Sequence, residues 1–121
     1  MRNIMTPRIF DIKLTEHEIQ NEIIKLLKIK GIFGVRLNSG MFKSGQRFIR
    51  CYTLPDGTSK GMPDIMCLTK TGGIFFIECK AAHGKLSPEQ SAFIEIMNNY
   101  NIKVIVANNW IEILNYVESI I

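Results

Sequence analysis

The chain has 121 residues, of which 46% are hydrophobic and 21% are charged, and its formal net charge is +4. This length fits one domain and the hydrophobic content is enough for one core, so we expect one ordered domain and no second one. No apolar run approaches the roughly 18 residues that a membrane span needs. The first 15 residues show no apolar run followed by a small-residue cleavage site, so we expect no secretory signal. We therefore expect an intracellular, cytoplasmic protein with no membrane partner.

Positive charge is concentrated in the first half of the chain. Residues 1–60 contain eleven Lys and Arg against five acids, whereas residues 61–121 contain four against six. Clustered positive charge attracts the phosphates of nucleic acids, although a merely solvated basic surface would have the same composition. The three cysteines and two histidines lack the paired spacing of a structural zinc site, so we expect reduced thiols and no zinc.

The predicted elements begin with a helix and continue with short strands. Residues 14–29 repeat apolar side chains at helical spacing, and Thr15 can cap the start of this helix. Turn residues at 38–40 and 44–45 predict a loop after the first strand. Four apolar, β-branched or aromatic segments predict strands before the next helix: residues 32–37, 47–54, 65–68 and 74–80.

The second half of the chain contains two more predicted helices with a strand between them. Ser87 at the N-cap, Pro88 at the first helical position and Gln90 open the first of these helices. A β-branched strand at 103–107 follows, and Asn108 or Asn109 caps the last helix. The order α-β-β-β-β-α-β-α predicts an α/β fold with a mixed central sheet flanked by helices. We treat residues 1–121 as one domain, with 1–13 as an N-terminal arm and 109–121 as the C-terminal helix.

Two charged residues lie at the end of the apolar strand 74–80. Alternation places Glu78 and Lys80 on one face of this strand, so that a carboxylate and an ammonium project side by side. Asp64 begins the partner strand, and the connection at 71–73 predicts a hairpin that brings Asp64 close to Glu78. The alternative is an ordinary ion pair on an exposed sheet, which explains poorly why both charges end an apolar strand.

Two carboxylates beside a lysine are suited to cleaving a phosphodiester bond. Mg²⁺ prefers oxygen ligands and usually takes one or two carboxylates together with waters and phosphate oxygens. A metal and a positioned cation can share the tasks of activating water and stabilising charge on the phosphoryl oxygens. We therefore expect Asp64 and Glu78 to bind a divalent metal beside Lys80, with the backbone carbonyl of Cys79 as a further ligand.

Two more polar residues are expected to point toward the interior. At about 100° per residue, Glu16 lies on the apolar side of the first helix, whereas Glu18 and Glu22 lie away from it. Gln90 points inward from the first turn of its helix by the same reasoning. The alternative for Glu16 is a solvated acid favoured by the helix dipole, and the alternative for Gln90 is a capping-box contact to the Ser87 amide.

Basic and polar residues outside this centre are candidates for contacts to DNA. Side chains of this kind contact phosphates and position the nucleic acid without reading its sequence. The alternative for each of them is a solvated surface. The candidates are Arg36, Asn38, Ser39, Lys43, Arg47 and Lys85.

Five short motifs resemble those of a known family. They are Glu16-x-x-x-Gln20, Arg36-x-Asn38-Ser39-Gly40, Gly61-x-Pro63-Asp64, Glu78-Cys79-Lys80 and Ser87-x-x-Gln90. In their order and spacing, over about residues 15–107, the chain resembles the VRR-NUC domain of the PD-(D/E)XK nuclease superfamily, which has a restriction endonuclease-like core. Cys79 stands where Val or Leu is more frequent, which suits a buried face.

The resemblance implies a Mg²⁺- or Mn²⁺-dependent DNA endonuclease in which Asp64 and Glu78 are metal ligands and Lys80 is the catalytic lysine. Glu16 falls on the family's helical acid, which would reach the metal directly or through water, and Gln90 falls on its downstream glutamine. Stand-alone members from phages and bacteria resemble Holliday-junction resolvases, act as homodimers and are often encoded beside replication helicases. Branched DNA, a second copy of the chain and a helicase or replication protein are therefore the expected partners, in a bacterial cell or a phage-infected host.

Two other functions fit the same residues. A restriction-type or general DNase would use the same site on a different DNA substrate. A non-catalytic DNA-binding accessory protein would keep the fold and lose the chemistry, but Asp64, Glu78 and Lys80 are all present. A structure-selective endonuclease is favoured because one small domain has little surface for base-specific readout.

Overall fold

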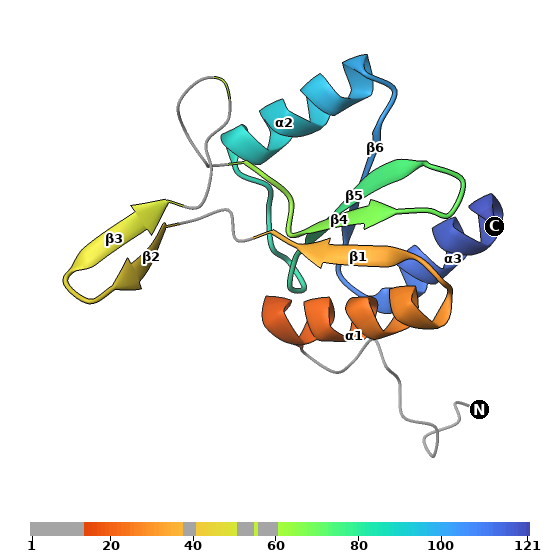
Figure 1. The fold of residues 1–121 in the computed structure, drawn as a ribbon, viewed down its shortest axis with the longest axis horizontal. Coiled ribbons are helices and arrows are strands. Elements are labelled where there is room, and N and C mark those ends of the chain that lie inside the picture. The colour runs from red at the N-terminus through yellow and green to blue at the C-terminus, as the bar shows by residue number, and fades with distance from the viewer. Residues whose placement is uncertain (1–13, 38–40, 51–54, 56–60) are drawn as a thin grey trace.

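A computed structural model describes residues 14–37, 41–50, 55 and 61–121 of the chain (Figure 1). Amphipathic helices and short apolar strands alternate in the described residues. In chain order the elements are α1 (Glu16–Ile29), β1 (Phe33–Arg36), β2 (Met41–Ser44), β3 (Arg47–Arg50), β4 (Ile65–Leu68), β5 (Ile74–Cys79), α2 (Pro88–Asn99), β6 (Lys103–Ala107) and α3 (Trp110–Ile120).

Four strands form one mixed sheet with the order β1-β4-β5-β6. β4 pairs antiparallel with both β1 and β5, whereas β6 lies parallel to β5. The parallel pair is possible because α2 carries the chain back across the sheet between β5 and β6. The predicted α/β fold class, with a mixed central sheet and flanking helices, is confirmed, and β4 and β5 are the two central strands.

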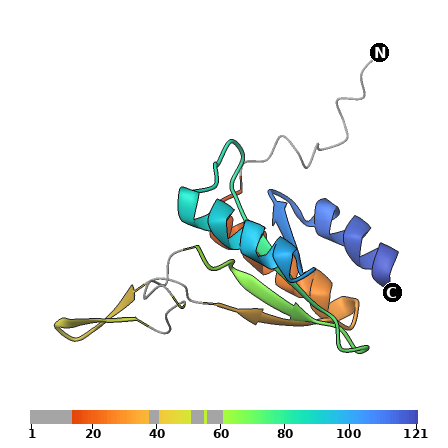
Figure 2. The same cartoon turned by 90° about the horizontal axis from the view of Figure 1, so that it is seen from above.

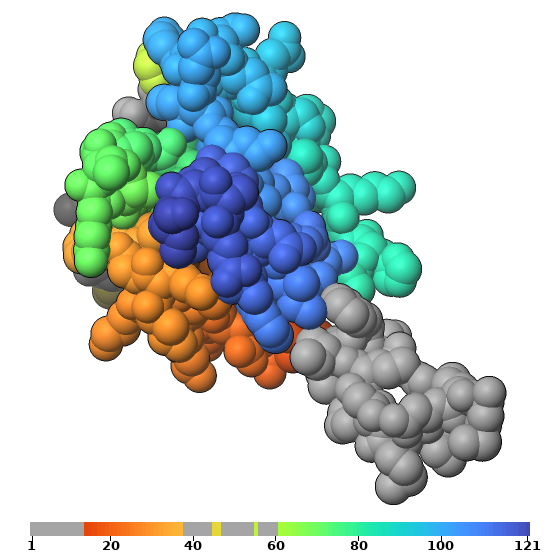
Figure 3. Space-filling model, turned by 90° about the vertical axis from the view of Figure 1, so that its right-hand side faces the viewer, coloured from red at the N-terminus to blue at the C-terminus, as the bar shows by residue number. Residues whose placement is uncertain are grey.

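The sheet is covered by helices on both faces (Figure 1), with α1 and α3 on one side and α2 on the other. The main core lies between the sheet and the pair α1 and α3, and it takes alternate residues of β5. α3 lies beside α1 at the surface of the molecule (Figure 3). Fully buried members of this core include Ile19, Ile23, Leu27, Ile65, Cys67, Ile77, Cys79, Ile113 and Val117.

The opposite face of β5 packs against α2 with a smaller apolar contact. The Phe76 and Phe93 rings meet edge to face, with centroids 5.7 Å apart. Phe76 and Glu78 are two residues apart on β5 and share this face. The α2 side of the sheet is therefore the side on which polar groups are held.

The structure corrects the prediction of a loop after β1. Residues 41–44 form the strand β2, which pairs antiparallel with β3 through a turn in which Gly45 has φ 64°. Four residues with only two apolar side chains give a weak periodic signal, and pairing with β3 decides their conformation. The predicted strand 47–54 is β3 over Arg47–Arg50, and residues 51–54 lie outside the described residues. Figure 2 shows this hairpin projecting from the body of the molecule.

The helix ends follow the capping residues in the sequence. The Thr15 hydroxyl accepts from the Glu18 N–H at 3.1 Å, and Glu18 Oε1 accepts from the Thr15 N–H at 2.9 Å, so α1 begins with a capping box. Of the two candidate caps for α3, Asn109 is the N-cap. In the described part of the chain, no helix has the length and apolarity needed to cross a membrane.

Candidate active site

The pairing of β4 with β5 brings two carboxyl groups together. Ile65 lies opposite Ile77 in the antiparallel register, and the backbone N–H of Asp64 donates to the Ile77 carbonyl at 3.1 Å. Asp64 therefore comes one step before β4 and Glu78 one step after Ile77, which places them side by side on the α2 face. The predicted hairpin through residues 71–73 produces this geometry.

Asp64 is held by the backbone of the neighbouring strand. Its Oδ2 accepts a hydrogen bond from the Cys79 N–H at 2.7 Å, which fixes the carboxylate at the end of β5. The next residue is tied to the strand on the other side, since the Lys80 N–H donates to the Ala107 carbonyl at 2.9 Å. Backbone hydrogen bonds thus hold the whole Glu78–Lys80 segment in place.

Glu78 is the buried polar residue at the centre of the site. Only 3% of its surface is exposed, and its Oε2 accepts from Gln90 Nε2 at 3.0 Å and lies 3.7 Å from Lys80 Nζ. A buried carboxylate needs such partners, because an unpaired buried charge is expensive. Glu78 on β5 is thus contacted by Lys80, which follows the strand, and by Gln90 of α2.

Gln90 makes both of the contacts that the sequence left open, since it points inward to Glu78 and also forms the capping box. Its Oε1 accepts from the Ser87 N–H at 2.8 Å, and its backbone N–H donates to Ser87 Oγ at 3.1 Å, so the capping box is formed. Its Nε2 is directed to Glu78 at the same time. One amide therefore joins the start of α2 to the carboxylate, with its oxygen used by the helix and its nitrogen by the site.

The two carboxyl groups perturb each other. Burial, and next the nearby charge of Asp64, raise the pKa of Glu78 to about 8, although Lys80 lowers it. Burial also raises the pKa of Asp64, against the hydrogen bond from the Cys79 amide, which lowers it. Without a bound cation, the two groups resist carrying two negative charges together.

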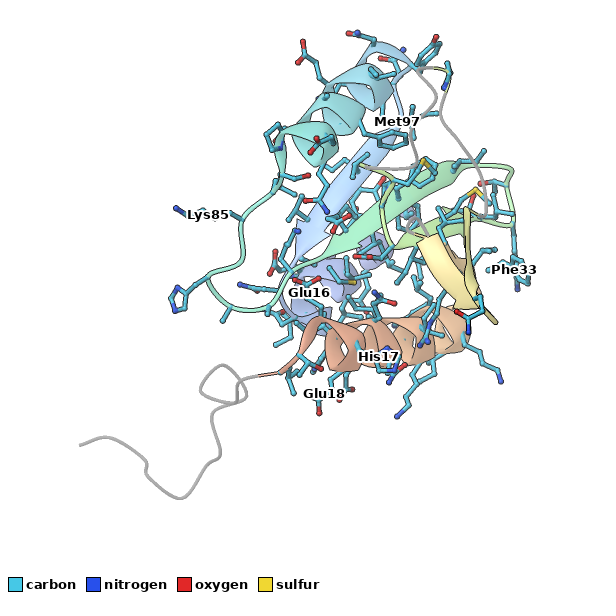
Figure 4. All side chains as sticks on the ribbon, turned by 90° about the vertical axis from the view of Figure 1, so that its left-hand side faces the viewer. Glu16, His17, Glu18, Phe33, Lys85 and Met97 are labelled. Carbon is cyan, nitrogen blue, oxygen red and sulfur yellow. The ribbon has the colours of Figure 1, made fainter. Side chains whose placement is uncertain are left out.

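Glu16 lies at the start of α1, close enough to influence this pair. Its charge contributes to raising the pKa of both Asp64 and Glu78, and its side chain is exposed. Figure 4 shows Glu16 pointing from the helix toward the strands, whereas Glu18 points away from them. The Glu16 side chain is exposed and makes no hydrogen bond with another described residue, so we place it at the rim of the site.

The loop before Asp64 is packed against the first turn of α2. Gly61 has φ 92°, and a Cβ at this position would lie 2.5 Å from the Glu89 carbonyl oxygen. Both the backbone conformation and the close approach therefore require glycine. Pro63 is fully buried, so this loop leads Asp64 to its place by close contact with the helix that also supplies Gln90.

Of the six predicted DNA contacts, the structure describes the side chains of Arg36 and Lys85. The Arg36 guanidinium donates to Asn21 Oδ1 on α1, a contact that the sequence did not reveal. Lys85 is exposed in the loop between β5 and α2 and points away from the body of the protein (Figure 4). Lys43 belongs to β2 and Arg47 to β3, and their side chains lie outside the described part. Asn38 and Ser39 also lie outside the described residues.

The donor set is suited to a hard divalent cation. Among the described residues, no three His, Cys, Asp or Glu side chains are close enough to hold a metal by themselves. Two carboxylates and a backbone carbonyl would leave positions for water and phosphate oxygens, which is the usual way in which Mg²⁺ is bound. Cys67 and Cys79 are buried and free of a disulfide, whereas Cys51 lies outside the described residues.

Sequence reasoning missed the residues that line the site on its β6 side. Val106 pairs with Glu78 in the parallel register, and Asn108 and Glu112 follow at the start of α3. The sequence identifies Asn108 as a candidate helix cap, but nothing in the sequence indicates that Asn108 lies near Lys80. Gly61 and Pro63 belonged to a motif, but the contact with α2 could not be read from it.

Comparison with known proteins identifies the family. The family model of the VRR-NUC domain matches residues 15–110. A solved structure described as a VRR_NUC domain is similar in fold, with a TM-score of 0.63 and 18% sequence identity, and the match covers 89% of this chain and all of that chain. No curated protein matches the sequence. Since the matched segment includes both helices and all strands that build the site, the chain belongs to the VRR-NUC domain family of the PD-(D/E)XK nuclease superfamily.

Proposed function

We propose that the protein is a divalent-metal-dependent endonuclease that hydrolyses phosphodiester bonds in DNA, with a preference for branched DNA such as four-way junctions. The observation that carries the proposal is the buried Glu78 carboxylate, with Asp64 beside it and Lys80 Nζ 3.7 Å away. Membership of a nuclease family supports the reaction class. The small domain, with little surface for base-specific readout, supports selection by DNA shape.

Asp64, Glu78 and the Cys79 carbonyl would hold one Mg²⁺ or Mn²⁺, and Glu16 would reach it through water. The raised pKa values of both carboxyl groups support this, because burial and, after it, nearby negative charge raise them, and a bound cation would offset both effects. When bound, the ion supplies charge neutralisation and lowers the pKa of water. Mn²⁺ has the same preference for carboxylate and water ligands and would substitute.

The chain's own residues would position the phosphate and the ligands. Lys80 Nζ would donate to a nonbridging phosphate oxygen and stabilise the charge that grows there in the transition state. Gln90 Nε2 keeps the Glu78 carboxylate in one orientation, and the Cys79 N–H does the same for Asp64. This preorganisation means that little rearrangement is needed when substrate binds.

We also propose that the active form is a homodimer. A four-way junction has two equivalent strands to cut, and a two-fold symmetric pair of chains would present two active sites to them. Light scattering at assay concentrations tests this, and a monomer that resolves junctions on both strands would contradict it.

The decisive experiment is cleavage of synthetic four-way junctions, flaps and linear duplexes by the wild type in Mg²⁺, Mn²⁺ and Ca²⁺. We expect cleavage of the junction in Mg²⁺ and Mn²⁺, and binding with little cleavage in Ca²⁺. Sequence-specific cutting of linear duplex would favour a restriction-type enzyme. A folded protein that cuts none of these DNAs, or an Asp64→Ala protein as active as the wild type, would remove the proposal.

A further inference from the structure

A pocket of about 130 Å³ lies directly beside Lys80, at the ends of the parallel strands β5 and β6. Lys80, His83 and Gly84 line it from the loop that follows β5. Val106, Asn108 and Glu112 line it from β6 and the start of α3. In open sheets, ligands bind in the crevice outside the carboxyl ends of the strands, which is where this pocket lies.

The wall formed by the β5–α2 loop has a fixed shape. The Gly84 N–H donates to the Ala81 carbonyl at 2.8 Å, and His83 has φ 66°, in the left-handed region that is uncommon for residues other than glycine. A Cβ on Gly84 would lie 3.0 Å from the Ala81 oxygen and 3.5 Å from the Lys80 stem. The turn therefore packs closely on Lys80, and non-glycine residues in such conformations are concentrated at functional sites.

The opposite wall presents a donor and an acceptor. Asn109 Nδ2 donates to Asn108 Oδ1 at 2.9 Å, which orients the Asn108 amide and leaves its Nδ2 without an acceptor among the described residues. Glu112 Oε1 accepts from the Asn108 N–H and from Asn109 Nδ2, each at 3.3 Å. The Glu112 carboxylate is therefore held at the rim, where it disfavours a phosphate and favours a neutral group that can donate a hydrogen bond.

We propose that this pocket receives one unpaired single-ring nucleobase, from a nucleotide adjacent to the phosphate that is cleaved, with cytosine as the best match. The proposal rests on the proposed nuclease function. The volume of the pocket is close to that of an apolar cavity of about 150 Å³ that holds a benzene ring. A pyrimidine therefore fits, whereas part of a purine would remain outside the pocket. The Asn108 amide would donate to N3 of cytosine, and Glu112 would accept from its N4 amino group.

This assignment gives the site a reason to prefer branched DNA. A base can enter the pocket only when it is unstacked and unpaired, and this costs least at a branch point, a flap or a mismatch. With the base held beside Lys80, the neighbouring phosphate would be fixed relative to Lys80 and Glu78. The pocket would therefore contribute to the choice of both DNA structure and cleavage position.

The test begins with wild-type protein in Mg²⁺ on a four-way junction whose cleavage positions have been mapped. Each nucleotide flanking the cleaved phosphate is then replaced, one at a time, by cytosine, thymine, a purine or an abasic residue. At one of the two positions we expect kcat/KM to fall about tenfold from cytosine to an abasic residue, the size of one base contact, and to fall for purines. The other position should respond much less.

Two variants sharpen the result. Val106→Phe fills the pocket, so its defect on cytosine substrates should be relieved by an abasic residue at the responsive position. Asn108→Ala removes the donor and should reduce the preference for cytosine, while Ile96→Phe adds the same ring to the exposed side of α2 and serves as the control. Thermal unfolding shows whether each variant is folded. The abasic series tests the pocket with the wild-type protein alone, so it does not depend on any variant folding.

The outcomes separate the two proposals. If the wild type cuts the junction and neither flanking position responds to base or abasic replacement, the pocket proposal is wrong and the nuclease function stands. Val106→Phe activity that is lost equally on cytosine and abasic substrates also contradicts it. If the folded wild type cuts no DNA, the proposed function fails, and the pocket proposal fails with it.

Discussion

The two faces of β5 differ in what they pack against. Phe75, Ile77 and Cys79 are buried in the apolar core under α1 and α3, whereas Phe76 and Glu78 face α2. On the α2 side, one aromatic pair is followed immediately by two carboxyl groups, an amide and an ammonium. A single strand therefore supplies the core with one set of residues and the site with the alternate set.

This comparison indicates how a small domain supports a buried charged site. The core face has enough apolar packing to hold β5 in place, so the α2 face can carry groups that cost stability when no cation is bound. The clearest ways to test this division are substitutions that affect one face and leave the other unchanged.

The largest effect is expected from Lys80→Met, which removes the ammonium from the α2 face and keeps the stem beside Gly84. Loss of one preorganised group that stabilises transition-state charge costs about 10²–10³-fold in rate, and we expect kcat/KM on the junction to fall by that factor. The melting temperature should change little. Lys103→Met, at an exposed position on β6, is the matched control. Equal activity of the two variants would exclude Lys80 from the reaction.

On the core face, Ile77→Ala should lower the free energy of unfolding by about 3 kcal/mol, because it leaves a cavity in a fully buried position. Ile74→Ala is the control on the same strand, where the side chain is 45% exposed and the cost should be well under half as large. Urea unfolding followed by circular dichroism measures both. Similar losses for the two variants would show that the faces of β5 do not differ as described.

The third prediction concerns the pH dependence of the metal-free protein. Because burial and Asp64 raise the pKa of Glu78 from its ordinary 4.5 to about 8, the folded state binds a proton that the unfolded state releases over this interval. The stabilisation is present below pH 4.5 and is lost as the pH rises toward 8, with a slope of at most about 1.4 kcal/mol per pH unit. Urea unfolding at a series of pH values measures it.

Glu78→Gln is the variant that isolates this effect, since a neutral amide cannot titrate. We expect a flatter profile for this variant between pH 4.5 and 8, and higher stability than the wild type at pH 8 without metal. Mg²⁺ should stabilise the wild type more at pH 8 than at pH 5, because binding competes with the proton. A wild-type profile as flat as that of Glu78→Gln between pH 4.5 and 8 would contradict the assignment.

Most of the fold could be predicted because its elements carry strong local signals. The apolar runs of β4 and β5, the turn between them and the Ser87-Pro88 helix start each determine their structure locally. β2 could not be predicted, since its strand conformation depends on pairing with β3. The turn residues on both sides of it favoured a loop.

The candidate site could be predicted where alternation or helical periodicity decides the direction of a side chain. Alternation along the strand predicts the direction of Glu78 and Lys80, and helical periodicity predicts that of Glu16, although their roles in catalysis stay predictions. What could not be predicted are contacts between elements far apart in the sequence, such as Arg36 with Asn21 and the pocket between Lys80 and Asn108. These depend on how α1, α3 and the sheet are packed, which no local pattern encodes.

The smallest effect is expected at Gln90, where the contact made by the amide oxygen and the contact made by the amide nitrogen can be tested separately. Gln90→Glu keeps an oxygen for the Ser87 N–H, so the capping box stays, but it replaces the donor to Glu78 with a second negative charge. Ser87→Ala is the matched variant, because it removes the hydroxyl cap and keeps the Gln90 contact with Glu78. We expect Ser87→Ala to lose about 1 kcal/mol of stability with near-normal activity. If Glu78 binds the metal as proposed, Gln90→Glu should lose about 10- to 100-fold in activity, because Gln90 then orients a metal ligand. If Ser87→Ala lowers activity as much as Gln90→Glu, then Gln90 acts only by starting α2, and its contact with Glu78 has no separate role.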